Sequence, residues 1–265
     1  MLGDIVGKPG RQVVQQQLPG LVKQYEPHVV VANAENTAGG SGLTPQIFSK
    51  LQAYGVHGVT LGDHVYRQKE IVPTLEAEAN IVRPANLPAA AAGRRWMLLQ
   101  PDAKQPPLAV CLVLGRLFMT GQQADDPFVE ADRFLAEIPR EAVPVVEIHA
   151  EATSEKVALG HYLDGRAAAV VGTHTHIPTA DAKILPQGTA YITDLGMTGP
   201  YDSILGRRTD RVLQYMTTAM PAPFDVADAD VRLCGVFFEY DNDRGRCVRV
   251  ERVERAADLE RPPFG

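Results

Sequence analysis

The sequence predicts an α/β protein whose β-structure is mixed, with parallel strands and antiparallel hairpins. Short apolar runs rich in β-branched residues alternate along the chain with segments whose apolar residues recur at helical spacing. That alternation is typical of βαβ units, whose strands are parallel. Two pairs of neighbouring strand-like runs, 96–99 with 108–114 and 231–240 with 246–253, instead predict hairpins.

The first part of the chain shows this alternation clearly. The predicted strand His28–Ala32 has the sequence HVVVA, which is apolar and β-branched. A helix is predicted to begin at Thr44 and Pro45, because threonine is a favoured N-cap and proline is tolerated at the first helical position. Gly55 is expected to end that helix.

The later elements follow the same order. Proline and alanine cluster in segments 84–93 and 101–107, which indicates loops. The remaining predicted elements are strand 56–61, a helix around Val72 and Leu75, strands 96–99 and 108–114, helix 126–138, strand 143–148, helix 154–163, strand 167–171, and strands 231–240 and 246–253.

The composition is that of a globular protein. Hydrophobic residues make up 45 % and charged residues 22 % of the 265 residues, which argues against a disordered chain, a coiled coil or a collagen-like repeat. No apolar run approaches the roughly 18 residues of a membrane span, and the N-terminus lacks the pattern of a secretory signal. We therefore expect a cytoplasmic protein with no membrane partner.

Net charge and cysteine content argue against three further classes of protein. The net charge is −6 and no segment carries a basic stripe, which argues against a dedicated nucleic-acid-binding surface. The chain has three cysteines, an odd number, and no CxxC pair. A disulfide framework and a zinc-finger site are therefore not expected.

Polar side chains that can bind metal ions follow the predicted strands directly. Because sites form at the carboxyl ends of strands in open α/β sheets, we expect these residues to meet although they are distant in sequence. Imidazole, carboxylate and amide oxygen ligands suit Mn, Fe, Zn or Co, and the set is too large for one tetrahedral ion but suits two ions about 3.5–4 Å apart. The residues are Asp4, Glu35, Asn36, Asp63, His64, His149, His174 and His176.

Each of these motifs alone also has an ordinary structural explanation. A single aspartate after a strand is most often a cap or turn residue, and a His-x-His pair such as His174 and His176 is compatible with a surface position. Five such turns at one sheet edge are harder to explain in this way, so we favour a metal centre. His28, His57 and His161 have no other candidate ligand nearby in the sequence and are expected to be structural or exposed.

Several segments together resemble a known family. They are GDIVGKPGR, NAENTAGGSGLT, TLGDH, RPAN, HAEATSEK, GTHTHIPTAD and ITDLGMTGPYDS, in order from Asp4 to about Phe224. The sequence is similar to the YmdB-type metallophosphoesterases of bacteria, a branch of the calcineurin-like superfamily. The resemblance implies a four-layer αββα sandwich with mixed sheets, formed by one metallophosphoesterase domain over 1–265 whose C-terminal hairpin and tail begin at about 225.

The resemblance also implies a site and an activity. The implied activity is hydrolysis of phosphodiesters, with 2′,3′-cyclic nucleotides as the best-associated substrates, at two divalent ions that are iron or manganese, with zinc as a further candidate. In the implied chemistry a metal-bound hydroxide attacks phosphorus and a histidine protonates the leaving alkoxide. The implied roles are Asp4, Glu35, Asn36 and His176 on one ion, Glu35 bridging to a second ion held by Asp63, His149 and His174, and His64 as the catalytic acid.

The chain departs from the family pattern in two places. The family has asparagine at the position of Asp63, so here three carboxylates oppose two divalent ions, and we expect lower activity or a changed metal preference. Only three residues precede Asp4, where the family has a full strand. We therefore expect either a start further upstream or a loosely anchored Asp4.

Other functions remain open at this point. A phosphomonoesterase on the same scaffold uses the same metal core, so the ligands do not distinguish it from a diesterase. A non-catalytic or weakly catalytic metal-bound protein that senses a nucleotide is a second alternative. The sequence contains no GxSxG motif for a serine nucleophile and no GK[ST] of a P-loop. A homo-oligomer is compatible with the sequence.

Overall fold

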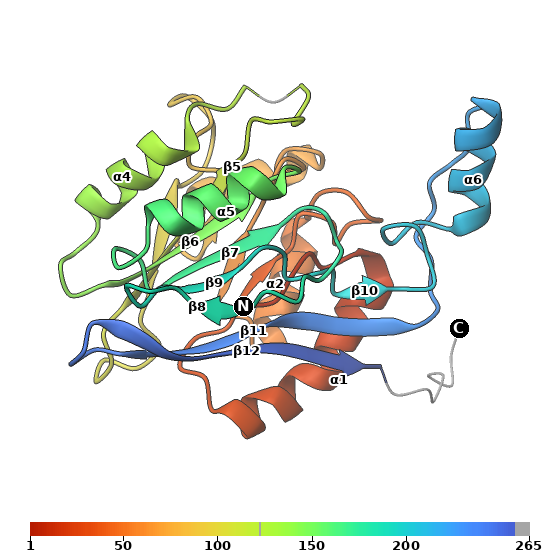
Figure 1. Cartoon of the computed structure of the whole chain (residues 1–265). Coiled ribbons are helices and arrows are strands. Elements are labelled where there is room, and N and C mark those ends of the chain that lie inside the picture. The colour runs from red at the N-terminus through yellow and green to blue at the C-terminus, as the bar shows by residue number, and fades with distance from the viewer. Residues whose placement is uncertain (122, 258–265) are drawn as a thin grey trace.

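Two β-sheets pack face to face, and helices cover the outer side of each sheet (Figure 1). The computed structural model describes residues 1–121 and 123–257. The end of the predicted C-terminal tail, 258–265, lies outside the described residues. The layer order is helix, sheet, sheet, helix, which confirms the mixed four-layer sandwich expected from the sequence.

The first sheet has a parallel half and an antiparallel half. The parallel strands are β1 (Val31–Asn33), β2 (Gly58–Thr60) and β3 (Ile81–Val82). The antiparallel strands are β10 (Gly199–Pro200), β11 (Val231–Asp241) and β12 (Arg246–Ala256), so the hairpin predicted near the C-terminus is confirmed.

The N-terminal residues join these two halves. Leu2 pairs in parallel with Ala32 of β1 and antiparallel with Gly235 of β11. The Ile5 N–H donates to Asn33 O at 3.0 Å, and the carbonyl of Asp4 accepts from Thr198 N at 2.8 Å. Asp4 is therefore held by backbone bonds on both sides and is wholly buried, rather than loosely anchored.

The second sheet has the strand order β4-β5-β6-β7-β9-β8. Strands β5, β6, β7 and β9 are parallel, and the edge strands β4 and β8 run antiparallel to their neighbours, which confirms the predicted β4–β5 hairpin. The bounds are β4 (Trp96–Leu99), β5 (Leu108–Leu114), β6 (Val143–His149), β7 (Ala169–Thr173), β8 (Lys183–Ile184) and β9 (Ala190–Ile192).

Helices from the first third of the chain cover the first sheet. They are α1 (Gly7–Tyr25), α2 (Pro45–Ala53), the 3₁₀ turn η1 (Lys69–Ile71) and α3 (Val72–Ala77). The second sheet is covered by α4 (Pro127–Glu137) and α5 (Thr153–Tyr162). Helix α6 (Thr209–Thr218) stands away from the sandwich at the right of Figure 1 and buries only Val212.

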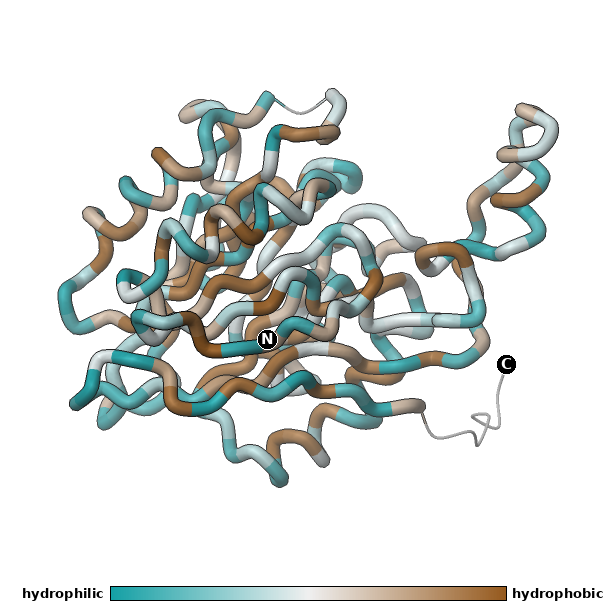
Figure 2. Tube along the Cα trace, viewed as in Figure 1, coloured by the Kyte–Doolittle hydropathy of each residue, from teal (hydrophilic) through white to brown (hydrophobic). Residues whose placement is uncertain are grey.

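Apolar side chains between the sheets explain why the strands are so hydrophobic. The inner faces meet through residues such as Val31 of β1, Val145 of β6 and Val236 of β11. A parallel strand covered on both faces must be apolar throughout, because water reaches neither face. Figure 2 shows the corresponding hydrophobic stretches along the strands of the interior.

Helix α1 was not predicted from the sequence. It contains Pro19 followed by Gly20, a pair that ordinarily indicates a turn. Val14, Leu18 and Leu21 nevertheless recur at helical spacing and are buried against the first sheet. Pro19 lies on the exposed side of the helix, so the carbonyl that it cannot bond faces water.

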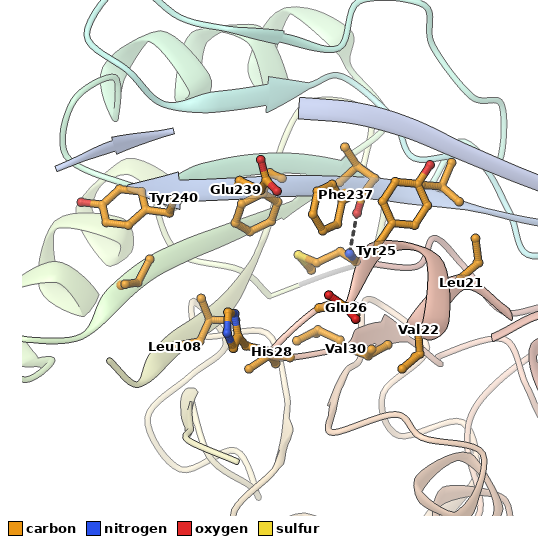
Figure 3. Close-up of a pocket in the computed structure, with 18 of the residues that line it drawn as sticks. Leu21, Val22, Tyr25, Glu26, His28, Val30, Leu108, Phe237, Glu239 and Tyr240 are labelled. Atoms are coloured by element: carbon orange, nitrogen blue, oxygen red, sulfur yellow. Dashed lines mark hydrogen bonds between the residues drawn. The ribbon is translucent and has the colours of Figure 1, made fainter. Parts of the chain in front are cut away.

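A cavity of about 280 Å³ opens between the end of α1 and the β11–β12 hairpin (Figure 3). Tyr25, His28, Leu108 and Phe237 are among its lining residues. His28 precedes β1, and Leu108 begins β5, so the cavity lies at the amino ends of these strands. The predicted metal ligands lie at the opposite, carboxyl ends.

Candidate metal centre

The predicted ligands converge between the two sheets, at the carboxyl ends of parallel strands. Glu35 and Asn36 follow β1, and Asp63 and His64 follow β2, all on the side of the first sheet. Asp4 reaches the same place from the N-terminal segment beside β1. The second sheet contributes His149, the last residue of β6, and His174 and His176, which follow β7.

The turn after β7 carries backbone strain that is typical of functional sites. His174 has φ 97° and His176 has φ 65°, both in the left-handed region that non-glycine residues rarely adopt. Asp194 holds the residue between them, because its Oδ2 accepts from Thr175 N at 3.1 Å and from Thr175 Oγ1 at 2.7 Å. Lys156 Nζ donates to the same oxygen at 2.7 Å, and this ion pair is buried.

Four side chains form one compact group of ligand atoms. His149 Nε2 lies 3.0 Å from Asp63 Oδ1 and 3.1 Å from His174 Nδ1. Glu35 Oε1 is 3.2 Å from His149 Nε2, and His174 Nδ1 is 3.5 Å from Asp63 Oδ1. Ligand atoms bound tetrahedrally at about 2.1 Å from one ion would stand about 3.4 Å apart, so the spacing suits a shared cation.

A second group lies beside the first and shares Glu35. His176 Nε2 is 3.9 Å from Asp4 Oδ1, and the Nδ1–H of His176 donates to the carbonyl of Leu205 at 3.0 Å. The lone pair of His176 Nε2 therefore faces the centre. Asn36 Nδ2 lies 3.2 Å from that nitrogen and 3.2 Å from Glu35 Oε1.

Three observations indicate that these groups fit cations. Asp4 Oδ1 is buried and has no hydrogen-bond partner in residues 1–121 and 123–257, which is costly for a carboxylate oxygen unless a cation or water neighbours it. Asp4, Glu35 and His149 place ligand atoms within 4.8 Å of one another, as do Asp63, His149 and His174. A Cβ added at Gly62 would collide with Glu35 Oε2 and His149 Nε2, so only glycine leaves this space free.

The electrostatics of the centre are those of several anions around one buried imidazole. Burial alone would lower the pKa of His149, but the charge of Glu35 and hydrogen bonds to Asp63 and Glu35 raise it well above its usual value. Burial raises the pKa of Asp4. Burial acts in the same direction on Glu35 and Asp63, but His149 lowers the pKa of both. Three carboxylates thus lie close together with one protonated imidazole between them. Divalent cations bound here would offset the remaining negative charge.

His64 lies beside the carboxylates of the centre, and its ring offers a ligand atom within 4.8 Å of those of Glu35 and Asp63. Its backbone N–H donates to Glu35 Oε2 at 2.9 Å, and its Nδ1 is 2.7 Å from Asn36 Oδ1. The side chain is 27 % exposed, and Nε2 is 3.7 Å from Asp63 Oδ2. Nδ1 is therefore held by a hydrogen bond, while Nε2 makes the longer approach to Asp63.

A family model described as YmdB-like protein matches residues 1–253. The chain belongs to the YmdB-like family. A Bacillus subtilis member named 2′,3′-cyclic-nucleotide 2′-phosphodiesterase is 44 % identical over 253 residues, which cover 95 % of this chain and 94 % of that protein.

Two solved structures have the same YmdB-like fold. A hypothetical protein from Thermus thermophilus has a TM-score of 0.90 and 41 % identity, covering 97 % of this chain and 98 % of that one. A Mycoplasma pneumoniae structure described as a novel phosphatase has a TM-score of 0.90 and 31 % identity, covering 96 % and 92 %. Among the described residues of this YmdB-like chain, no helix is long and apolar enough to cross a membrane.

Several residues around the centre were not singled out from the sequence. Glu147 is wholly buried although it lies in the apolar strand VPVVEIH, and that interruption was the signal that could have found it. Lys156 and Asp194 lie inside the motifs HAEATSEK and ITDLGMTGPYDS, but only the structure pairs them. Arg83 and Asn86, which are polar and lie near the motifs, are both buried and bond backbone groups outside the ligand set.

Proposed function

We propose that the chain is a metal-dependent phosphodiesterase that hydrolyses 2′,3′-cyclic nucleotides at a dinuclear centre. The proposed ligands are Asp4, Glu35, Asn36, Asp63, His149, His174 and His176, with Glu35 between the two ions and His64 as general acid. The observation that carries the proposal is the clustering of Asp4, Glu35, Asp63, His149 and His174, where Asp4 Oδ1 is buried and has no hydrogen-bond partner among the described residues. The name of the Bacillus subtilis relative supports the substrate class.

The donor set supports two hard or borderline ions rather than a soft one. Histidine nitrogens and carboxylate or amide oxygens suit manganese, iron or zinc, and the three cysteines of the chain lie in the hydrophobic clusters or strands rather than at the centre. We propose manganese or iron as the resident metals. We also propose a cytoplasmic location, with which free, buried cysteines are in keeping.

Residues of the chain have separate roles in the proposed hydrolysis. When bound, two divalent cations supply positive charge to the phosphoryl oxygens and lower the pKa of a water molecule toward neutrality. His64 is placed to supply the proton that the leaving ribose oxygen needs, because its Nδ1 is held by Asn36 and its Nε2 is left for the substrate. Asp194 and Lys156 keep the strained His174–His176 turn in its ligand-bearing shape.

Product analysis tests this function directly. Purified protein with Mn²⁺ is incubated with 2′,3′-cyclic AMP, and 2′-AMP and 3′-AMP are separated by chromatography. We expect metal-dependent release of a single isomer, and the isomer identifies the bond that is cut. No turnover by protein that binds two Mn²⁺ ions per chain would contradict the proposal and favour a nucleotide-sensing role.

A phosphomonoesterase is the second candidate, because the Mycoplasma pneumoniae structure is described as a phosphatase. The same assay separates the two activities when 3′-AMP and p-nitrophenyl phosphate are offered alongside the cyclic nucleotide. A diesterase releases AMP and stops there. Release of inorganic phosphate from the monoesters at a comparable rate would favour the second candidate.

A further inference from the structure

We infer that Thr173, oriented by Glu147, keeps a proton on Nδ1 of His149 and so leaves the lone pair of Nε2 for the metal centre. The inference rests on the proposed function, because it takes His149 as a ligand of that centre. Neither Glu147 nor Thr173 contacts substrate in this scheme; both are positioning residues. Glu147 is 0 % exposed and accepts hydrogen bonds from residues on three different strands.

Glu147 lies between the sheets and accepts hydrogen bonds from both. From the first sheet, Asn33 Nδ2 donates to Glu147 Oε1 at 2.8 Å and Thr60 Oγ1 donates to Oε2 at 2.6 Å. From the second sheet, Thr173 Oγ1 donates to Oε1 at 2.8 Å. A buried carboxylate needs such donors, because burial without them would be prohibitive.

The direction of this chain of hydrogen bonds follows from its first member. The Glu35 N–H donates to Asn33 Oδ1 at 3.1 Å, which fixes the amide so that Nδ2 faces Glu147. Glu147 Oε1 therefore acts as an acceptor. Thr173 has a single hydroxyl proton, and when that proton goes to Oε1, its oxygen has only lone pairs left to offer.

The hydrogen bond from His149 to Thr173 fixes the position of a proton on the imidazole ring. His149 Nδ1 lies 2.9 Å from Thr173 Oγ1, so Nδ1 must carry a proton and donate it to that oxygen. When a cation takes the place of the proton on the other nitrogen, the lone pair that it meets is then on Nε2, which faces Asp63, Glu35 and His174. Histidine ligands are commonly set in this way by a partner on the other nitrogen, and loss of such a partner costs about 10–100-fold in metal affinity or activity.

The structure also provides a matched control. Thr60 and Thr173 are both buried, both donate to Glu147, and both lie in strands that flank the gap between the sheets. Only Thr173 also contacts His149. A purely structural role for Glu147, as a tie between the sheets, would make the two threonines equivalent.

The experiment compares Thr173→Val, Thr173→Ser and Thr60→Val by Mn²⁺ titration, with free Mn²⁺ followed by electron paramagnetic resonance. We expect Thr173→Val to weaken Mn²⁺ binding by about 10–100-fold, and Thr173→Ser and Thr60→Val to stay close to the starting protein. Equal weakening in both valine variants, or no weakening in Thr173→Val, would overturn the inference. Thr173→Ala replaces Thr173→Val if the valine variant does not fold.

A second readout does not depend on metal loading. In proton NMR spectra of the metal-free protein, the Nδ1–H of His149 should give a slowly exchanging imidazole resonance that is lost in Thr173→Val and kept in Thr60→Val. Retention of every such resonance in Thr173→Val would overturn the inference. Failure of the unmutated protein to bind Mn²⁺ would instead contradict the proposed function, so the two failures are distinguishable.

Discussion

Asp63 and His64 are adjacent in the chain but stand in different positions at the proposed centre. Asp63 Oδ1 points at His149 Nε2, inside the cluster of ligand atoms. His64 turns its Nδ1 to Asn36, and its Nε2 lies 3.7 Å from Asp63 Oδ2. At the residue scale, this difference is consistent with the proposed roles of Asp63 as a ligand and His64 as a proton donor, and each role can be tested by a single substitution.

His64→Ala should keep the metals and lose turnover. The leaving ribose oxygen is a strong base, and loss of a general acid typically costs about 10²–10⁴-fold in rate. The measurement is kcat on 2′,3′-cyclic AMP together with Mn²⁺ content, with bis-p-nitrophenyl phosphate as the comparison, since its leaving group needs no proton. An equal loss on both substrates would argue against the acid role, and loss of metal would make His64 a ligand, as its distance to Glu35 also allows.

Asp63→Asn should speed the reaction and loosen the metals. The substitution keeps an oxygen ligand and removes one negative charge from a centre that has three carboxylates, so the ions polarise phosphate more strongly. A gain of about 1 kcal/mol in transition-state stabilisation corresponds to about fivefold in kcat. Steady-state kinetics and Mn²⁺ titration provide the check, and a variant with unchanged rate and metal preference would count against this account of Asp63.

At the scale of elements, the turn after β2 is built around the space at Gly62. The turn brings Asp63 and His64 to the centre, and its glycine lies where a side chain would meet Glu35 and His149. The φ of Gly62 is not in the left-handed region, so the backbone itself would accept an alanine. The constraint at this position is therefore the room for the site, not the conformation of the turn.

Gly62→Ala should abolish metal binding while the protein still folds. We expect Mn²⁺ affinity to fall by at least about 100-fold, the upper end of the cost of disturbing a ligand's surroundings. Gly20→Ala is the control, since a Cβ there meets nothing and helix α1 should gain about 0.5–1 kcal/mol. Mn²⁺ titration and thermal melts of both variants give the answer. Undiminished Mn²⁺ binding in Gly62→Ala would show that the ions do not use this space.

At the scale of the whole molecule, the centre bridges the two sheets. Asp4, Glu35 and Asp63 come from the side of the first sheet, whereas His149 and His174 come from the second. Cations bound here would tie the sheets together at one end of the sandwich. Binding to the folded state alone stabilises it by mass action, so metal content and thermal stability should be coupled.

Chelation should lower the melting temperature of the protein. Free metal at 100 times its Kd contributes about 2.7 kcal/mol, and each kcal/mol shifts Tm by about 2–4 °C in a protein of this size, so we expect a fall of about 5–10 °C. Differential scanning fluorimetry with Mn²⁺ and with EDTA measures it. Gly62→Ala should show no response to EDTA, and an unmutated protein whose Tm is indifferent to EDTA would contradict the coupling.

Much of the fold could be predicted because its signals are local. The strand that ends at Leu114 is marked by a continuous apolar run, and the hairpin β11–β12 by two strand-like runs around a polar turn. Helix α4 follows its cap, Asp126, at the predicted start. The ligand residues could be predicted for a related reason. All but Asp4 lie at or just beyond the carboxyl end of a strand, and parallel strands bring those ends to one edge of a sheet.

The sequence by itself determined the longer strands and helices α2 to α5, the family resemblance and the identity of the candidate ligands, because each depends on neighbouring residues. Helix α6 and the short strands β3, β8, β9 and β10 were not predicted. Only the tertiary structure decided that α1 continues through Pro19, since burial of Leu18 and Leu21 outweighs a local turn signal. It alone also decided how Glu147 reaches Asn33 and Thr173. Those contacts join residues up to 114 positions apart, and no local pattern encodes which distant hydroxyl or amide a buried carboxylate will meet.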